Sequence, residues 1–195
     1  SGKLTIEGKG ILKVYGNQDE GEGIATTDND ITINGGEIYI ESNDDGLNAG
    51  GDNGGIITIK SGNVTIKANG DGIDSNGSLI INGGSVYTIG SSKGGDAGID
   101  TDKSFEINGG NVIALGSDMI QNPDKTSKQK YISFNMKNVI SSGSNISIKN
   151  GKEDIVNFVA NEDFKTLIIS NSKINSGNYD LYVDGKKTSY SYEVK

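Results

Sequence analysis

The first 120 residues repeat one short pattern of apolar residues, and this repeat constrains the fold more than any other feature. Its copies begin at residues 31, 57, 79 and 105, so equivalent positions are separated by 26, 22 and 26 residues. Within each copy apolar and polar residues alternate, as in residues 57–59 and 64–66, which is typical of strands. Because one such unit cannot bury its apolar face alone, the repeat predicts a stacked solenoid.

Four ladders of apolar residues follow from the alignment of the copies. Identical positions in adjacent coils would lie ~4.8 Å apart, the usual distance between paired strands. Each coil would contain three short strands, so that like residues form continuous inner rows. The ladders are Ile31, Ile57, Leu79 and Phe105; Ile33, Ile59, Ile81 and Ile107; Ile38, Val64, Val86 and Val112; and Leu47, Ile73 and Ile99, which Ile24 extends.

The turn between the second and third strands of each coil is rich in Asn and Gly. These residues tolerate the positive φ that a tight corner needs, but Asn-Gly also favours β-hairpins, which leaves an antiparallel meander as the alternative. The shared period, with length changes confined to residues 50–55 and 91–95, favours the parallel β-helix. The four turns are Asn34-Gly35-Gly36, Lys60-Ser61-Gly62, Asn82-Gly83-Gly84 and Asn108-Gly109-Gly110.

The chain is expected to be one all-β domain with two parts. Residues 1–120 form the parallel β-helix coils, with residues 1–30 as a degenerate capping coil. Residues 121–195 lack the acidic repeat, begin with a polar loop at 121–130, and form either further coils or a small sheet that closes the end. In this part strands are expected at 131–136, 145–149, 155–160, 167–170 and 179–183, with a hairpin turn at Asp184-Gly185.

The amino-acid composition excludes several kinds of chemistry. The sequence has no His, Cys or Arg, so ordinary zinc, copper and iron sites and Ser-His-Asp or Cys-His catalysis are absent. The net charge of −8 argues against nucleic acid as a partner, and no apolar stretch reaches membrane-spanning length. A secreted or cell-surface location is expected, with a leader not present in these residues. Oxygen-ligand chemistry remains, which suits hard cations.

Acidic residues gather in the turn before the first strand of each coil and on the outward face of that strand. Stacking would place their carboxylates roughly 5 Å apart, where like charges repel unless a divalent cation lies between them. Calcium takes six to eight oxygen ligands, so two adjacent turns could supply a site; a solvated acidic edge is the alternative. The predicted calcium ligands are Asp45, Asn48, Asp71 and Asp74 for one site, and Asp71, Asp74, Asp96, Asp100 and Asp102 for another.

Tyrosine and lysine side chains are the candidates for ligand binding. Tyr39 and Tyr87 occupy equivalent outward positions and would either stack on sugar rings or cover the sheet face. Lys67 and Lys93 are candidate ligand-binding cations. Together with Lys103 they are also weak candidates for a catalytic base beside calcium, although solvated surface lysines are the simpler explanation.

The repeated units resemble those of a bacterial family of carbohydrate-binding β-helix proteins. The resemblance lies in the "NGG-x-[VI]" and "[DG]-[DA]-G-[IL]-[DN]" units and in LIISNSKINSGNYDLYVDG at residues 167–185, and it covers essentially the whole chain. It implies a right-handed parallel β-helix, shaped like the pectate lyases, that binds calcium and acidic or cellulosic polysaccharide. The acidic residues that match the family's "DGI" units are Asp45, Asp71, Asp74, Asp96 and Asp100.

Three functions are consistent with these residues. We favour an extracellular calcium-binding module that recognises acidic (polygalacturonate-like) or cellulosic polysaccharide. The alternative is a calcium-dependent pectate lyase with a Lys base, since the absence of Arg excludes an Arg base. A structural spacer or adhesin, which would neither bind nor cleave sugar, is the third.

Overall fold

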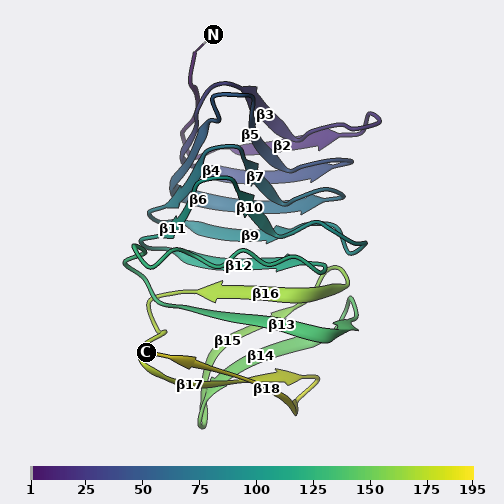
Figure 1. Cartoon of the computed structure of the whole chain (residues 1–195), viewed down its shortest axis with the longest axis vertical. Helices are drawn as coiled ribbons and strands as arrows, with labels where there is room; N and C mark the ends of the chain where they lie inside the picture. Colours follow the sequence, from purple (N-terminus) through teal and green to yellow (C-terminus); the bar gives the residue numbers. More distant parts are fainter. Residues whose placement is uncertain (1) are drawn as a thin grey trace.

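The computed structural model describes residues 2–195, which contain eighteen strands and no helix (Figure 1). The N-terminal part is a β-solenoid: successive coils lie side by side and pair through parallel strands. Each coil contributes one strand to a parallel sheet that has four strands within the described residues. The solenoid therefore has about four turns. The predicted parallel β-helix is therefore confirmed, whereas its handedness stays a prediction.

Three columns of parallel strands make up the solenoid wall. β4 (Ile31–Ser42) and β6 (Ile56–Ala68) each bend at a corner and contribute to two columns. The first column also contains β1 (Leu4–Ile6), β8 (Ser78–Ile81) and β11 (Ser104–Ile107), and the second contains β2 (Ile11–Gly16), β9 (Ser85–Ile89) and β12 (Asn111–Gly116). The third column consists of β3 (Ile24–Thr27), β5 (Leu47–Gly50), β7 (Ile73–Ser75) and β10 (Ile99–Thr101).

The strand register confirms the four predicted ladders. Ile31 pairs with Ile57, which pairs with Leu79, and the other ladders pair in the same way. The ladder residues are at most 2% exposed, except for Ile24 in the first coil at 9%. A further inward row consists of Ile40, Ile66, Thr88 and Ala114. Stacking therefore produces one continuous apolar core through the solenoid.

Glycine is required at the corner between the first and second columns. The last residue of each Asn-Gly-rich turn has φ between 85° and 98°, a backbone conformation that residues with a Cβ rarely adopt. At this corner β4 and β6 bend but continue, so each of these long strands belongs to both the first and the second column. The four residues are Gly36, Gly62, Gly84 and Gly110.

A second set of glycines lets neighbouring coils approach each other just before the third column. A Cβ on Gly72 would lie 2.0 Å from Thr88 Oγ1 and 2.5 Å from the carbonyl oxygen of Gly98. A Cβ on Gly46 would lie 2.1 Å from Ile66 Cγ2. These glycines immediately precede Leu47 and Ile73, so they lie where each acidic turn ends and the third-column strand begins.

Residues 121–195 continue the second column in antiparallel fashion and then form a separate sheet. After the loop at 121–130, β13 (Tyr131–Ile140) pairs with β16 (Phe164–Ser170), and β16 pairs with β12. The remaining strands form an antiparallel sheet at the end opposite to the N-terminus (Figure 1): β15 (Glu153–Val159), β14 (Asn145–Asn150), β17 (Gly177–Val183) and β18 (Lys186–Val194). Each strand predicted in this part is present, and Asp184-Gly185 forms the β17–β18 turn as expected.

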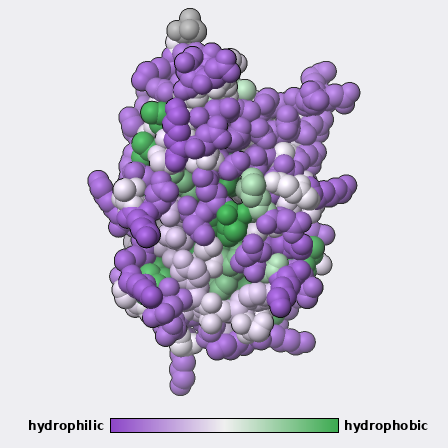
Figure 2. All heavy atoms as spheres, in the orientation of Figure 1, coloured by the Kyte–Doolittle hydropathy of each residue, from purple (hydrophilic) through white to green (hydrophobic). Residues whose placement is uncertain are grey.

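The core continues into this part as a second cluster of buried residues that includes Phe164, Tyr179 and Leu181. The face shown in Figure 2 is predominantly hydrophilic, with hydrophobic residues gathered in a patch near its middle. Among residues 2–195 no helix is long and apolar enough to cross a membrane.

The close contact at Gly72 predicts that Gly72→Ala destabilises the solenoid. The added methyl group would overlap backbone and side chain, which should cost about 2–3 kcal/mol and lower Tm by roughly 5–10 °C. Gly10→Ala is the matched control, because a Cβ there meets nothing within 4 Å and the backbone φ is ordinary. Thermal unfolding followed by circular dichroism measures both. Equal Tm values for the two variants would contradict the proposed packing role.

Candidate functional site

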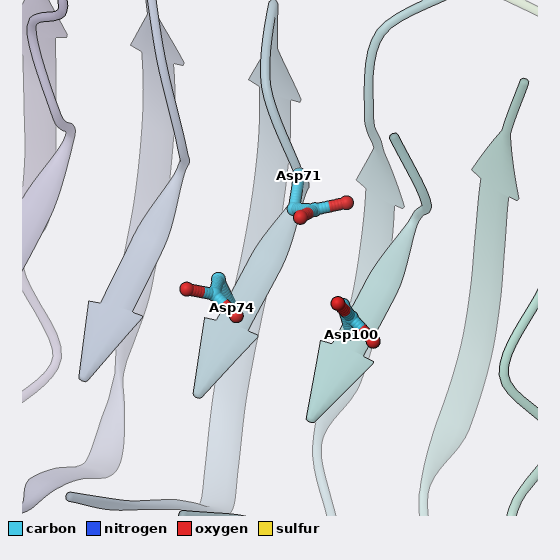
Figure 3. Close-up of side chains that lie close together, drawn as sticks. All are labelled: Asp71, Asp74 and Asp100. Carbon is cyan, nitrogen blue, oxygen red and sulfur yellow. The ribbon is translucent and has the colours of Figure 1, made fainter. Parts of the chain in front are cut away.

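The predicted acidic residues form a continuous column along the third wall of the solenoid. Asn48 on β5, Asp74 on β7 and Asp100 on β10 pair in register, with their side chains on the outward face. Asp71 lies in the turn just before β7 (Figure 3). One carboxylate oxygen from each of Asp71, Asp74 and Asp100 lies within 4.8 Å of the other two. The predicted proximity of these three carboxylates is therefore confirmed, whereas their role as calcium ligands stays a prediction.

Some of these carboxylates also hold the stacked turns in place. Asp45 Oδ1 accepts a hydrogen bond of 2.7 Å from the backbone N–H of Asp71. One coil further on, Asp71 Oδ1 accepts a bond of 2.5 Å from the N–H of Ala97. Each aspartate thus uses one oxygen to fix the next turn, which leaves the other oxygen for the column. This structural role was not predicted from the sequence.

The first two coils contribute a second group of polar side chains around Asn48. The Asn48 amide nitrogen donates to Glu22 Oε1 at 2.8 Å and to Asp45 Oδ2 at 3.1 Å. Glu22 Oε2 and Asn48 Oδ1 are inaccessible to solvent and have no hydrogen-bond partner among the described residues. Buried oxygens without a donor are costly, so this group is incomplete with protein atoms alone. Glu22 is an addition to the predicted ligand set.

Burial and mutual repulsion raise the pKa values of the column. Burial, followed by the charge of Asp45, raises the pKa of Glu22 to about 7. Burial also raises the pKa of Asp71 to about 7, with the charges of Asp45, Asp100 and Asp74 adding to it. For Asp74, burial and the charges of Asp45 and Asp100 raise the pKa to about 6. The fold therefore holds these carboxylates where their charged forms are disfavoured.

The other predicted calcium ligands, Asp45, Asp96 and Asp102, differ in burial. Burial raises the pKa of Asp45. Burial also raises the pKa of Asp96, and the charge of Asp44 adds to this effect. Asp102 is exposed on the turn after β10. The second predicted site therefore has its centre at Asp71, Asp74 and Asp100, with Asp96 and Asp102 at its periphery.

The three candidate lysines do not converge on the acidic column. Lys67 on β6 forms an ion pair of 2.7 Å with Glu162, and this hydrogen bond holds the pKa of Lys67 above its usual value. Lys93 is exposed in the loop at 91–95, and Lys103 Nζ donates to the backbone oxygen of Asn53 at 3.4 Å. Within residues 2–195 no ion pair joins any of these lysines to Asp71, Asp74 or Asp100.

Tyr39 lies in a groove on the outer face of the second column, here named the Tyr39 groove. It has a volume of about 380 Å³ and is bordered by Tyr15, Glu41, Thr65 and Lys67, among others. Tyr15 is 59% exposed and Tyr39 is 43% exposed, so both side chains are open to solvent. Lys13 Nζ lies 6.0 Å from the centre of the Tyr39 ring.

Tyr87, two coils further along the same outward row, is covered by the C-terminal part of the chain. Its ring lies edge-on to Phe158 at 6.3 Å, and its hydroxyl accepts a hydrogen bond of 3.4 Å from the N–H of Asn161. Tyr87 therefore packs as cover for the sheet, whereas Tyr39 stays open. The contacts of Asn161 and Glu162 also limit the exposed row to the first three coils.

Sequence reasoning missed Tyr15 and Lys13 as residues of this groove, and it missed Glu162 as the partner of Lys67. Tyr15 pairs with Glu41 and Lys13 pairs with Tyr39, so extending the repeat alignment into the degenerate first coil would have found both. Glu162 comes from outside the repeat, in the turn between β15 and β16, and no local signal places it beside Lys67.

Comparison with known proteins identifies the family. A model of the family described as "Carbohydrate-binding domain-containing protein" matches residues 1–185. The chain belongs to this family. No curated protein and no solved structure gave a significant match. Membership in the family indicates that a saccharide is the partner of this solenoid.

The raised pKa values predict that the metal-free protein loses stability as the pH rises from about 4 to about 8. In the unfolded chain these carboxyls ionise near pH 4. In the folded protein Glu22 and Asp71 keep their protons until about pH 7, and Asp74 until about pH 6. Their stabilising contribution is therefore complete below the unfolded pKa and is lost through the folded pKa.

Thermal unfolding in chelator at pH 5 and pH 8 measures this effect. Asp74→Asn should make the loss of Tm between the two pH values smaller, because it removes one of the charges that repel. A metal-free protein that becomes more stable between pH 5 and pH 8 would contradict the prediction.

Proposed function

We propose that this protein is an extracellular calcium-binding module that binds acidic or cellulosic polysaccharide in the Tyr39 groove. The observation that carries the proposal is the pair of open tyrosine rings beside a lysine, on the rigid wall of a chain that belongs to a carbohydrate-binding family. Tyrosine combines an apolar face, which suits the C–H face of a sugar ring, with a polar hydroxyl.

Each residue of the groove has a distinct role in this proposal. The rings of Tyr15 and Tyr39 stack on sugar units, and Lys13 binds a carboxylate of an acidic sugar. Lys67 contributes less charge to the ligand, because Glu162 already neutralises it. Thr65 follows Tyr39 in the same outward row and offers a hydroxyl. Adjacent coils repeat every ~4.8 Å, a spacing that suits an extended sugar chain running along the solenoid axis.

Calcium would bind the acidic column. The available donors are carboxylate and amide oxygens, the ligands that calcium prefers. Two groups fit such an ion: Asp71, Asp74 and Asp100, and the group of Glu22, Asp45 and Asn48 with its two unpartnered oxygens. A bound cation would supply positive charge that offsets the repulsion between stacked carboxylates and so would stabilise the solenoid.

A lyase reaction is less well supported by the geometry. A lysine that acts as a general base needs a lowered pKa, whereas the Glu162 ion pair raises the pKa of Lys67. Lys93 and Lys103 make no ion pair with the Asp71, Asp74 and Asp100 group in the described part of the chain. Release of ultraviolet-absorbing unsaturated products from polygalacturonate by the intact protein with calcium would establish the lyase and overturn the non-catalytic function.

The proposed calcium sites predict a calcium-dependent rise in Tm that needs Asp74. At a calcium concentration about 100 times Kd, binding should stabilise the protein by ~2.7 kcal/mol and raise Tm by roughly 5–10 °C. Asp74→Asn should remove most of this rise. Asp52→Asn is the control, since Asp52 is an exposed acid outside the column. A full calcium response in Asp74→Asn would exclude this residue as a ligand.

The proposed sugar site predicts that Tyr39→Ala weakens binding to polygalacturonate or cellulose about tenfold, or ~1.4 kcal/mol, because one stacking ring is lost. Tyr182→Ala provides a matched control: Lys149 Nζ lies 5.1 Å from that ring, but the pair is on the C-terminal sheet. Sedimentation with insoluble polysaccharide in the presence of calcium measures both variants. Unchanged binding by Tyr39→Ala would place the sugar elsewhere.

A further inference from the structure

A second groove with aromatic and cationic walls lies at the end of the molecule opposite to the Tyr39 groove. It has a volume of about 420 Å³ and lies between the loop at 121–130, the start of β13 and the end of β18. Figure 1 places β13 and β18 near the C-terminal end, away from β2 and β4. The residues relevant to ligand binding are Lys125, Lys130, Tyr131, Tyr192, Glu193 and Lys195. We name it the Tyr192 groove.

Two half-buried tyrosines form the apolar wall of the Tyr192 groove. The ring centres of Tyr131 and Tyr192 lie 6.2 Å apart, with the planes tilted by 45°. On its inner side Tyr192 contacts Phe134 edge-on at 6.2 Å, so the core fixes its orientation. Burial and the neighbouring Tyr131 raise the pKa of Tyr192 to about 12. The pair resembles the open tyrosines of the Tyr39 groove in chemistry.

The loop that carries the lysines is held firmly against the last coil. Asp124 N donates to the carbonyl of Phe105 at 2.7 Å, and Gln129 N donates to that of Ile107 at 3.0 Å. The Gln129 side chain donates to the carbonyl of Gly110 and to Ser170 Oγ. The lysines of this loop are therefore presented from a fixed backbone, which lowers the entropic cost of binding.

The polar wall carries an excess of positive charge. Its lysines are Lys125, Lys130 and Lys195, and its carboxylates are Asp124 and Glu193. Asp124 already accepts a hydrogen bond from Phe105 N at 3.3 Å. Lys130 Nζ donates to the backbone oxygen of Lys195, which leaves its remaining donors free. Lysine side chains beside tyrosine rings favour an anionic ligand over a neutral one at this groove.

We propose that the Tyr192 groove is a second carbohydrate-binding site that takes a uronate-containing oligosaccharide segment. A sugar ring stacks on Tyr131 and Tyr192, and Lys125 and Lys130 bind the carboxylate. The choice of an acidic sugar rests on the proposed function, whereas the groove itself is independent of the Tyr39 groove and of the acidic column. Binding here needs no calcium. With two sites at opposite ends, one molecule would hold a long polysaccharide at two points or join two chains.

The test is a calorimetric titration of the full chain with a short oligogalacturonate, repeated with a cello-oligosaccharide of the same length. The variants are Tyr39→Ala, the double variant Lys125→Glu/Lys130→Glu, and the two combined. Lys128→Glu is the matched control, because Lys128 is an exposed residue of the same loop that does not line the groove. All of these lysines are exposed, so the variants leave the core intact.

The original protein should bind two oligogalacturonates. Tyr39→Ala should weaken one of these sites about tenfold and leave the other unchanged, also in chelator, and the added lysine reversals should weaken that remaining site at least about tenfold. Lys128→Glu should bind like the original protein. Equal affinity for the neutral oligosaccharide at the remaining site would overturn the role of the lysines.

The outcomes separate the two proposals. If the original protein binds only one oligogalacturonate and Tyr39→Ala weakens that binding, the Tyr39 site stands and the second site is overturned. If the original protein binds only one oligogalacturonate, and that binding is unchanged in Tyr39→Ala but weakened by lysine reversal, the second site stands and the Tyr39 site is wrong. If the original protein binds neither sugar, both are overturned.

Discussion

The in-register parallel pairing of successive coils is the constraint on which the rest of this structure depends. A coil of three short strands has too little apolar surface to fold alone, so stability comes from stacking like on like. The same register that places Ile57 against Leu79 places Asp74 against Asp100 on the next wall. Core formation and charge accumulation are therefore consequences of one set of backbone hydrogen bonds.

Because of this coupling, the acidic column stabilises the stacked turns through hydrogen bonds and also places mutually repelling carboxylates close together. Asp45 and Asp71 each fix the turn of the next coil by accepting a backbone hydrogen bond. The stacking that creates these bonds also buries the carboxylates and brings them close together, and burial first and repulsion second raise their pKa values. Neutral replacements would relieve the repulsion but would weaken the bonds to the turns, because a charged acceptor binds an N–H more strongly. The proposed cation between coils would offset the repulsion while leaving the charged acceptors in place.

The repeat made the solenoid predictable, and its end marks the limit of prediction. The ladders, the corner glycines and the cluster of Asp71, Asp74 and Asp100 all follow from one period. After residue 120 strands could still be located from alternation, but nothing local indicated that β16 would pair antiparallel with β12. The covering of Tyr87 by Phe158 and the ion pair between Lys67 and Glu162 depend on that pairing, so they were out of reach. β18 was overlooked although Thr188, Tyr190, Tyr192 and Val194 alternate.

The bent strands β4 and β6 have a consequence for how such a protein can change. Because each coil is closed by its own glycine corner, a duplicated coil could be inserted between existing ones without altering any wall. One insertion would lengthen the hydrophobic core, the row of acidic turns and the outer face together, by a single rung of ~4.8 Å. Duplication of coils in the gene would thus lengthen the surface available to a polymer, one coil at a time.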